Sequence, residues 1–445
     1  MQLKRSKSIR QQLSIATSSL LVAAPLQAAA AAQAGGSEFE NIQIELSQLY
    51  YSEDERVNVY KSQALVENEL NEDNLLRVNF VYDTMSGSSP NGRIYTDNSD
   101  ASGSVAVTTA SGFSFSTANN GAAVSQRAWV TPFSDTRTAL SVEWESSLSR
   151  LVRSIITGGA SYENDYDSYG TSGTLVWDFN QRRSTLTTGI GFSNDTIRPA
   201  SGNIPEGLGE LWCGTDPIDL AWLSSCDDKN QQVFQPANKR VVDYLVGLTQ
   251  VWNRDTLFQI NYSRSSESGY LTDPYKQVSV IDPSFNNKEY AVLYEKRPDI
   301  RSIQSVYLKA VNAASKTTTS YLSYRYFWDD WDVQAHTLDW KLRFDVGKRS
   351  YFQPHIRANY QTAAFFSKAS IAVNDEEFTD KPEYVSADHR LSEQTTITAG
   401  LKYGRTLGKE GKFGIRLEQM RQNYTGSILP NMKAWIVQVL LSNRF

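Results

Sequence analysis

The stretch WIVQVLLSNRF, which runs from Trp435 to Phe445, decides the fold class of this chain. Counted back from the C-terminus, alternate residues form an apolar set, whereas most of the residues between them are polar. This period of two predicts a β-strand with one face towards lipid and the other towards a polar lumen. The barrel-assembly machinery of Gram-negative bacteria usually recognises a closing strand of this kind with a terminal aromatic residue, whereas a sandwich strand that happens to end in Phe is the alternative. The residues predicted to form the assembly signal are Val437, Val439, Leu441 and Phe445.

The other end of the chain has the three parts of a secretory signal peptide. Lys4, Arg5, Lys7 and Arg10 are followed by a mostly apolar stretch over 13–26 and then by small residues up to Ala34. This order predicts a cleaved signal over 1–34, a barrel over 35–445 and a location in the outer membrane. Removal of these four cations changes the formal net charge from −5 to −9, which argues against a nucleic-acid partner. No later run of eighteen apolar residues predicts a membrane helix.

The alternation of apolar and polar residues recurs along the whole chain. Sixteen segments show it, and they predict an all-β fold, a closed antiparallel transmembrane β-barrel of sixteen strands. The segments are 42–50, 60–66, 76–82, 140–144, 152–162, 175–179, 186–192, 242–252, 258–262, 306–310, 322–328, 336–344, 352–360, 397–403, 413–417 and 435–445.

The lengths of the connections support this prediction independently. Every second connection is short and rich in turn-forming residues, and these connections are 67–74, 147–151, 180–184, 253–256, 312–318, 347–351 and 406–412. All the long connections belong to the other set, namely 86–135, 195–239, 266–302 and 363–394. Outer-membrane barrels have short periplasmic turns and long extracellular loops, so the pattern places both termini in the periplasm. Residues 86–135 are predicted to form either a surface loop or a segment folded into the lumen.

An ordered series of motifs resembles one family. The motifs are DTMSGSSPNG (83–92), SRSSESGYLTDPYK (263–276), YEKRPD (294–299), LSYRYFWDDW (322–331), QPHIR (353–357), SADHRL (386–391) and LKYG (401–404). They resemble the DUF3570 family of predicted outer-membrane barrels, which has no established activity. Its members are commonly encoded beside a flavin transferase, a small lipoprotein and a thioredoxin-like protein, so the resemblance implies a role linked to a redox partner. Two stretches depart from the family pattern, 97–124 and 209–230.

Cys213 and Cys226 are the only two cysteines of the chain. In an oxidising compartment they are predicted to form a disulfide, which would contribute about 3 kcal/mol in the chain-entropy model. A redox-active pair is the alternative, although the spacing is not CxxC. The chain has no CxxCH motif for covalent haem, and no cofactor is predicted.

The three histidines give little support for catalysis or for a metal site. His336 is predicted to face outwards, His389 lies in a long connection, and His355 alone is predicted to face the lumen, beside Arg357. A hydrolase needs a nucleophile next to a His that a third group orients, so the sequence predicts a protein that is not an enzyme. Two carboxylate clusters suit either a solvated rim or divalent cations that bridge lipid headgroups, namely Glu53, Asp54 and Glu55, and Glu163, Asp165 and Asp167.

The charged residues predicted to face the lumen separate into two walls. A closed barrel would place the walls opposite each other and create an electric field across the lumen. Pairing of each charge with its neighbours is the alternative, and Arg77, Arg153, Asp339 and Glu418 interrupt the separation. The basic wall consists of Lys309, Arg325, Lys341, Arg343, His355, Arg357, Lys402 and Arg416. The acidic wall consists of Glu45, Glu67, Asp83, Glu143, Glu145, Asp178 and Asp243.

Two functions are consistent with these features. The family resemblance favours a conduit or scaffold that serves a redox partner, with a small lipoprotein or a flavinylated periplasmic protein as the expected partner. The barrel size favours a porin-like channel for small charged or dipolar solutes, because sixteen strands can enclose an aqueous pore. A barrel hydrolase is a third alternative and would depend on His355. Outer-membrane lipid and the assembly machinery are the other expected partners.

Overall fold

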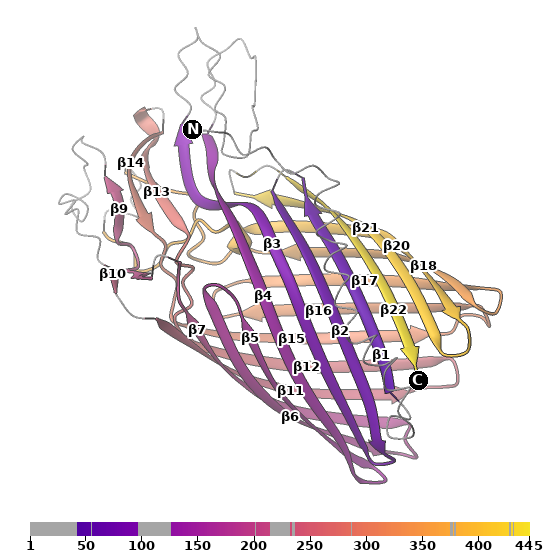
Figure 1. Ribbon diagram of the computed structural model, residues 1–445. Helices are drawn as coiled ribbons and strands as arrows, with labels where there is room; N and C mark the ends of the chain where they lie inside the picture. The colour runs from indigo at the N-terminus through magenta and orange to yellow at the C-terminus, as the bar shows by residue number, and fades with distance from the viewer. Residues whose placement is uncertain are drawn as a thin grey trace, which may run out of the picture.

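The computed structural model describes residues 42–54, 56–96, 126–200, 202–213, 232–233, 236–285, 287–373, 377, 380–426, 429 and 431–445. Sixteen strands form one closed antiparallel barrel, in which each strand pairs with the next strand of the barrel (Figure 1). The predicted fold class and strand number are therefore confirmed. The barrel strands are β1 (Ile42–Glu53), β2 (Val57–Asn71), β3 (Asn74–Thr96), β4 (Gln126–Ser149), β5 (Val152–Tyr162), β6 (Tyr166–Phe179), β7 (Ser184–Ile197), β11 (Ala237–Val251), β12 (Thr256–Gly269), β15 (Ile300–Asn312), β16 (Thr318–Asp329), β17 (Gln334–Val346), β18 (Ser350–Gln361), β20 (Glu393–Leu407), β21 (Gly411–Thr425) and β22 (Met432–Arg444).

The first and last strands close the barrel. β1 pairs antiparallel with β22, in a register that runs from Gln43 opposite Arg444 to Glu53 opposite Ala434. The backbone N–H of Phe445 donates a hydrogen bond of 2.9 Å to the carbonyl oxygen of Ile42. Of the residues predicted to form the assembly signal, Val437, Val439 and Leu441 thus lie in the strand that completes the ring, and Phe445 directly follows it. This pairing leaves no exposed edge in the sheet.

The outer face of the barrel is apolar. In β4, for example, Leu140, Val142 and Trp144 are all exposed. Exposed large apolar side chains recur at alternate positions in most of the other strands, and lipid would cover them in a membrane. In the described part of the chain, no helix is both long enough and apolar enough to cross a membrane.

The two ends of the barrel differ as the connection lengths predict. The seven connections predicted to be short are tight turns at one end, and the long connections all lie at the other end. We call these the short-turn end and the long-loop end.

The connection predicted over 86–135 is shorter in the structure. β3 continues to Thr96 and β4 begins at Gln126, with Ser86 opposite Ser134, so both strands extend beyond the predicted boundaries. Residues 97–125 lie outside the described residues, whereas the described flanks pair with each other, and β3 packs on β13 and β14 at the long-loop end. The motif SGSSPNG has the composition of a turn, but it forms part of β3, because these additional contacts stabilise the extended strand.

Two contacts hold this extension of β3. Arg93 makes a bidentate ion pair with Glu289, with a shortest N–O distance of 2.7 Å. Gly92 has a φ of +96°, and a Cβ atom there would lie 2.2 Å from the carbonyl oxygen of Gln277. Only glycine fits this position without strain.

The long connections also contain a small second sheet, which the alternation pattern did not predict. Its strands are short, in the order β19 (Ile371–Ala372), β13 (Gln277–Asp282), β14 (Lys288–Tyr294) and β9 (Glu210–Cys213). A two-residue pair, β8 (Ile204–Pro205) with β10 (Gln232–Val233), and two short 3₁₀ helices, Pro283–Phe285 and His389–Leu391, accompany it. We call this sheet, with its connections 270–299 and 362–392, the cap. Figure 1 shows the cap beyond the long-loop end of the barrel.

The cap has its own dry core. Val278, Val280, Ala291, Leu293 and Ile371 are all fully buried. A second apolar cluster, Trp331, Val333, Ala364, Phe366 and Leu391, joins the cap to the β16–β17 hairpin. The cap is therefore an ordered part of the fold rather than a set of loops.

A substitution on the outer face should test the assignment of the lipid face. Leu401 lies in the middle of β20 and is 47% exposed. Leu401→Arg should destabilise the folded barrel in lipid vesicles by about 2–4 kcal/mol, because it places a cation in the hydrocarbon layer. Reversible urea unfolding in vesicles measures this. The lumen-facing control Lys402→Arg should change stability by less than about 0.5 kcal/mol, and equal effects of the two would contradict the assigned faces.

Candidate functional site

A pocket of about 470 Å³ lies on the inner wall of the barrel, over β16 to β22, between the middle of these strands and their ends at the long-loop end. It contains charged, polar and apolar side chains from six strands. We call it the wall pocket. Its lining residues are Arg325, Phe327, Ala335, Asp339, Lys341, His355, Arg357, Asn359, Gln361, Thr396, Thr398, Arg416, Glu418, Met420 and Ile436.

The wall pocket brings together five of the eight residues of the predicted basic wall, namely Arg325, Lys341, His355, Arg357 and Arg416. Arg343 lies closer to the short-turn end, where it bonds to Asp345 and its guanidinium stacks on the ring of Tyr351. Lys309 and Lys402 are on lumen-facing positions of β15 and β20 but do not line the wall pocket.

His355 bridges two carboxylates at the base of the wall pocket. Its Nδ1 lies 2.7 Å from Oε1 of Glu418, and its Nε2 lies 2.8 Å from Oδ2 of Asp339. Ionised carboxylates only accept hydrogen bonds, so both ring nitrogens must donate, and the geometry suits the imidazolium cation. Two of the residues that interrupt the separation of charge in the sequence are thus the counter-ions of His355.

The bridge extends to the cations on either side. Nζ of Lys341 lies 2.9 Å from the second oxygen of Asp339, and Nη1 of Arg416 lies 3.8 Å from Glu418. Arg416 also donates to Gln438, whose amide donates to Ser47 across the closing seam of the barrel. A continuous polar chain therefore crosses from β17 to β1 and fixes the positions of these side chains.

Two local features of the backbone position His355. Pro354 precedes it and cannot donate a hydrogen bond, and the pairing of β17 with β18 is interrupted between the Lys341–His355 and Phe344–Phe352 pairs. Gly400 is the partner of His355 in β20, and a Cβ atom at position 400 would lie 2.3 Å from Cγ of Glu418. The missing side chain therefore gives Glu418 room to lie across β20 towards the imidazole.

Arg325 and Arg357 differ from the other cations of the wall pocket. Within the described part of the chain, neither guanidinium forms an ion pair with a carboxylate. The wall pocket contains five basic and two acidic side chains, so it has an excess of three positive charges when His355 is protonated. This arrangement can attract and bind an anion.

The acidic wall is partly neutralised by arginines of neighbouring strands. Arg77 pairs with Glu67, Glu143 and Glu145, and Arg153 also pairs with Glu145. These pairs support the alternative in which lumen charges pair with their neighbours.

The remaining acidic residues have different surroundings. Arg137, which the sequence pattern did not single out, pairs with Asp83 at 2.9 Å. Asp178 accepts a hydrogen bond from Thr185, and Glu45 and Asp243 form no ion pair with a described residue. Three arginines compensate only part of the seven acidic charges, so this wall keeps an excess of negative charge, and the predicted difference in charge across the lumen is reduced rather than removed.

The other predicted site residues lie apart from the wall pocket. His336 bonds through Nδ1 to the hydroxyl of Tyr324 and stacks on Tyr326. His389 lies in the cap, where burial lowers its pKa to about 4. Cys226 and the side chain of Cys213 lie outside the described residues, so their disulfide stays a prediction.

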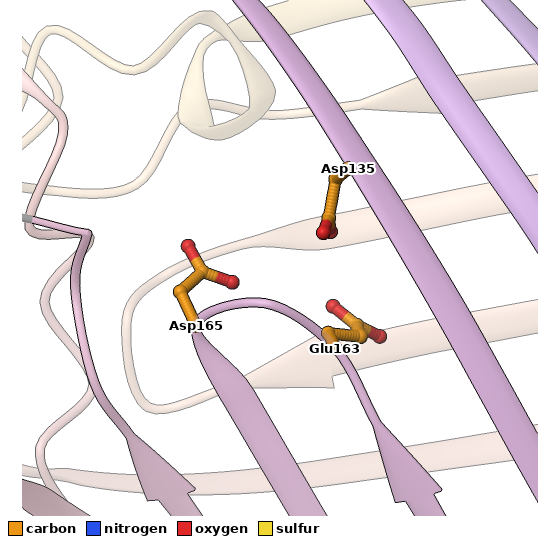
Figure 2. Close-up of side chains that lie close together, drawn as sticks. All are labelled: Asp135, Glu163 and Asp165. Carbon is orange, nitrogen blue, oxygen red and sulfur yellow. The ribbon is translucent and has the colours of Figure 1, made fainter.

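A cluster of carboxylates lies at the long-loop end. Oxygens of Asp135, Glu163 and Asp165 all lie within 4.8 Å of one another (Figure 2). Burial and the neighbouring Asp135 raise the pKa of Glu163, although Nε of Arg137 lies 3.9 Å away. These three residues could hold a divalent cation through oxygen ligands. The cluster predicted from the sequence is thus partly wrong, because Asp167 pairs with Arg198 instead.

The second predicted cluster does not form a comparable site. Glu53 accepts a hydrogen bond from Tyr51, and Asp54 is exposed. Glu55 lies outside the described residues.

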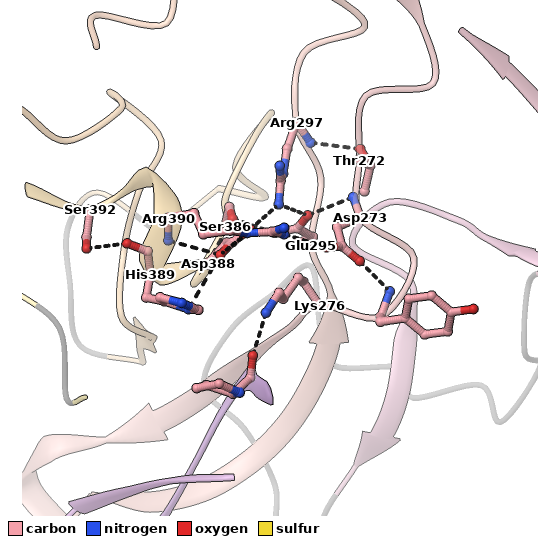
Figure 3. Close-up of polar contacts among 12 residues, drawn as sticks. Thr272, Asp273, Lys276, Glu295, Arg297, Ser386, Asp388, His389, Arg390 and Ser392 are labelled. Atoms are coloured by element: carbon pink, nitrogen blue, oxygen red, sulfur yellow. Dashed lines mark hydrogen bonds and ion pairs between the residues drawn. The ribbon is translucent and has the colours of Figure 1, made fainter. Parts of the chain in front are cut away.

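A buried network of charges holds the cap together (Figure 3). Nη2 of Arg297 lies 2.7 Å from Glu295 and 2.8 Å from Asp388, and both carboxylates are fully buried. Arg390 links Asp388 to Asp273, and the backbone N–H of Asp273 donates to Glu295. The network thereby joins the connection 270–299 to the connection 362–392.

Burial acts differently on the two acids of this network. It raises the pKa of Glu295 to about 7, although Arg297 opposes the rise. In Asp388 the effect of burial is outweighed by Arg390 and Lys276, which hold the pKa of Asp388 well below its ordinary value.

Comparisons with known proteins identify the family and a set of similar barrels. The model of the family described as "Protein of unknown function (DUF3570)" matches residues 10–442. A bacterial polysaccharide outer membrane secretin is 8% identical with a TM-score of 0.45, over 92% of this chain and 100% of the secretin. The siderophore receptor PirA from Pseudomonas aeruginosa is 7% identical with a TM-score of 0.39, over 92% of this chain and 62% of the receptor. A mutant of the ferric enterobactin receptor PfeA from Pseudomonas aeruginosa is 10% identical with a TM-score of 0.41, over 86% of this chain and 54% of the receptor. The comparison with curated protein sequences found no match.

The stability of the cap should depend on pH through Glu295. Because the folded state raises its pKa from 4.5 to about 7, the protonated form favours folding. This contribution is fully present below about pH 4.5 and is lost as the pH rises through about 7, with a maximum of about 3 kcal/mol. Hydrogen exchange of the amides of Val278, Val280 and Leu293, corrected for intrinsic rates, should therefore show less protection at pH 8 than at pH 5.

Two variants separate the effect of Glu295 on the pH dependence from the effects of other ionisable groups. Glu295→Gln cannot ionise, so protection of the cap should change much less between pH 5 and 8. Asp380→Asn, at an exposed position of the other connection of the cap, should keep the pH dependence of the unmodified protein. An unchanged pH dependence in Glu295→Gln would show that another group is responsible.

Proposed function

The chain belongs to the DUF3570 family, whose function is unknown, and from the residues that line its lumen we propose that it is an outer-membrane channel for small solutes that favours anions. The observation that carries this proposal is the wall pocket with its excess of three positive charges. Two of these charges, on Arg325 and Arg357, have no carboxylate partner among the described residues.

The barrel provides the setting that such a channel needs. A ring of sixteen strands can enclose an aqueous pore, and its apolar outer face suits a lipid bilayer. The walls of the pore have a low dielectric constant and concentrate the field of the charges on them. Arginine stays protonated at any physiological pH, so the attraction for anions is permanent.

The fixed charges of the wall pocket are positioned rather than mobile. Asp339, His355 and Glu418 form a compact bridge that holds Lys341 and Arg416 against β17 and β21. Arg325 and Arg357 thus stay available to a passing anion. Both nitrogens of His355 bond to carboxylates, which leaves neither to accept a proton from a nucleophile, so we propose no hydrolytic role for it.

Ion selectivity in a planar bilayer tests the proposed function. The purified full-length protein should give steady conductance steps, and its reversal potential in a salt gradient should indicate a preference for anions. The double change Arg325→Glu and Arg357→Glu replaces two positive charges with two negative ones, so the anion-to-cation permeability ratio should fall severalfold.

A matched control changes the charge outside the lumen. Arg264 is exposed, and its position in β12 alternates with lumen-facing residues. Arg264→Glu should leave the permeability ratio unchanged. If the double variant also leaves it unchanged, or if the folded protein does not conduct, the proposed function is wrong.

A second proposal is the conduit or scaffold for a redox partner that the family resemblance implies. One observation favours it. The inner wall over β3 to β11 has a hollow of about 350 Å³ lined mainly by glycine, serine and threonine, including Gly159, Gly170 and Gly191. This hollow leaves room for an inserted segment of a partner. Co-purification of a small lipoprotein or a flavinylated periplasmic protein, together with absent conductance, would favour this role over the channel.

A further inference from the structure

We propose that the wall pocket binds organic anions that join a carboxylate to an apolar body. This inference deepens the proposed function and rests on it, because the ligand would be a solute of the channel. It names a chemical class of solute rather than a preference for charge alone. The wall pocket has the size for such a ligand, since binding sites for small molecules usually have volumes of about 300–1,000 Å³.

The carboxylate would be bound by Arg325 and Arg357. Both guanidinium groups line the wall pocket, and they come from β16 and β18, on either side of β17. A guanidinium presents parallel N–H donors that match the two oxygens of a carboxylate. The acids of the wall pocket do not compete for these donors, because Asp339 and Glu418 bond to His355 and Lys341.

The apolar body would be bound by the side chains that share the wall pocket with these arginines. Phe327, Ala335, Met420 and Ile436 all line it. Apolar residues are unusual on the wall of a wet lumen, because water gains nothing from contact with them. Phe327 also packs against the apolar cluster that joins the cap to the barrel, but Met420 and Ile436 lie on β21 and β22, which contribute no residue to that cluster.

The arrangement distinguishes between classes of anion. An inorganic anion can use the arginines but has no part that covers Met420 and Ile436. A neutral aromatic molecule can cover the apolar side chains but leaves the guanidinium groups without a partner. Only a ligand that carries both a carboxylate and an apolar body contacts the arginines and the apolar side chains together, and it should therefore bind most tightly. Binding sites for small molecules generally combine apolar walls with a few polar groups in this way.

Calorimetric titration of the purified full-length protein in detergent tests this proposal. Benzoate is the probe, with acetate and inorganic phosphate as the anions that lack an apolar body. Benzoate should bind saturably and at least tenfold more tightly than acetate or phosphate. Arg357→Gln should weaken benzoate binding by about tenfold or more, because it removes a charged hydrogen-bond pair, and Arg325→Gln, on a different strand, gives a second test in case the first variant does not fold.

Two further variants separate the parts of the wall pocket. Met420→Asn should weaken the binding of benzoate but not that of acetate, because only benzoate contacts the apolar side. Lys309→Gln removes one lumen charge outside the wall pocket, and Arg264→Gln removes one charge outside the lumen. Both should keep the affinity for benzoate within twofold.

The outcomes distinguish this inference from the proposed function. If the channel prefers anions but benzoate does not bind saturably, the inference is wrong and the proposed function stands. Equal affinities for benzoate and phosphate would likewise overturn the inference, because the apolar side would then have no role. If benzoate binds as expected but the bilayer shows no preference for anions, the binding site stands while the proposed channel function is wrong.

Discussion

The pairing of β1 with β22 is the interaction on which the rest of the structure depends. In the hydrocarbon layer no water is present, so each backbone N–H and C=O group needs a partner within the protein. A sheet of sixteen strands meets this requirement only when it closes, and the register from Gln43 opposite Arg444 to Glu53 opposite Ala434 closes it. Closure also creates the lumen, and it connects the wall pocket to β1 through Arg416, Gln438 and Ser47.

Closure explains why so much of the fold could be predicted from the sequence. Because the strands of a barrel alternate between lipid and lumen, the apolar residues of β22 predict which face each side chain occupies. The same argument holds for β4, where Leu140, Val142 and Trp144 are all exposed on the outer face. The order of the strands is equally predictable, because each strand of the barrel pairs with the barrel strand that follows it in the chain.

The cap could not be predicted in this way, because its contacts join distant segments of the chain. Val280 pairs with Ala291 across β13 and β14 but also with Ile371, from a connection about ninety residues away. Its strands are short, and the central residues of β13 and β14 are buried on both faces, so these strands show no alternation of apolar and polar residues. The extension of β3 depends on the same non-local contacts, since Arg93 bonds to Glu289 in β14.

The candidate site was predictable in its residue types but not in its pairing. Alternation assigns Arg325, His355 and Arg357 to the lumen, yet it does not show which charges are compensated. That depends on geometry across strands, such as the place of Gly400 opposite His355, which leaves room for Glu418. Arg137 was missed for the same reason, because its pairing with Asp83 depends on the register of β3 and β4.

The cap and the wall pocket differ in whether their charged side chains are compensated by partners of opposite charge. In the network of the cap, each of the two fully buried acids, Glu295 and Asp388, has a basic partner, because a buried charge needs compensation. The wall pocket has no such balance, because water in the lumen can solvate the surplus cations. This surplus charge forms no stabilising ion pair, since Arg325 and Arg357 have no carboxylate partner among the described residues. Repulsion between two neighbouring guanidinium groups costs stability, and an anion that enters the lumen would remove that cost.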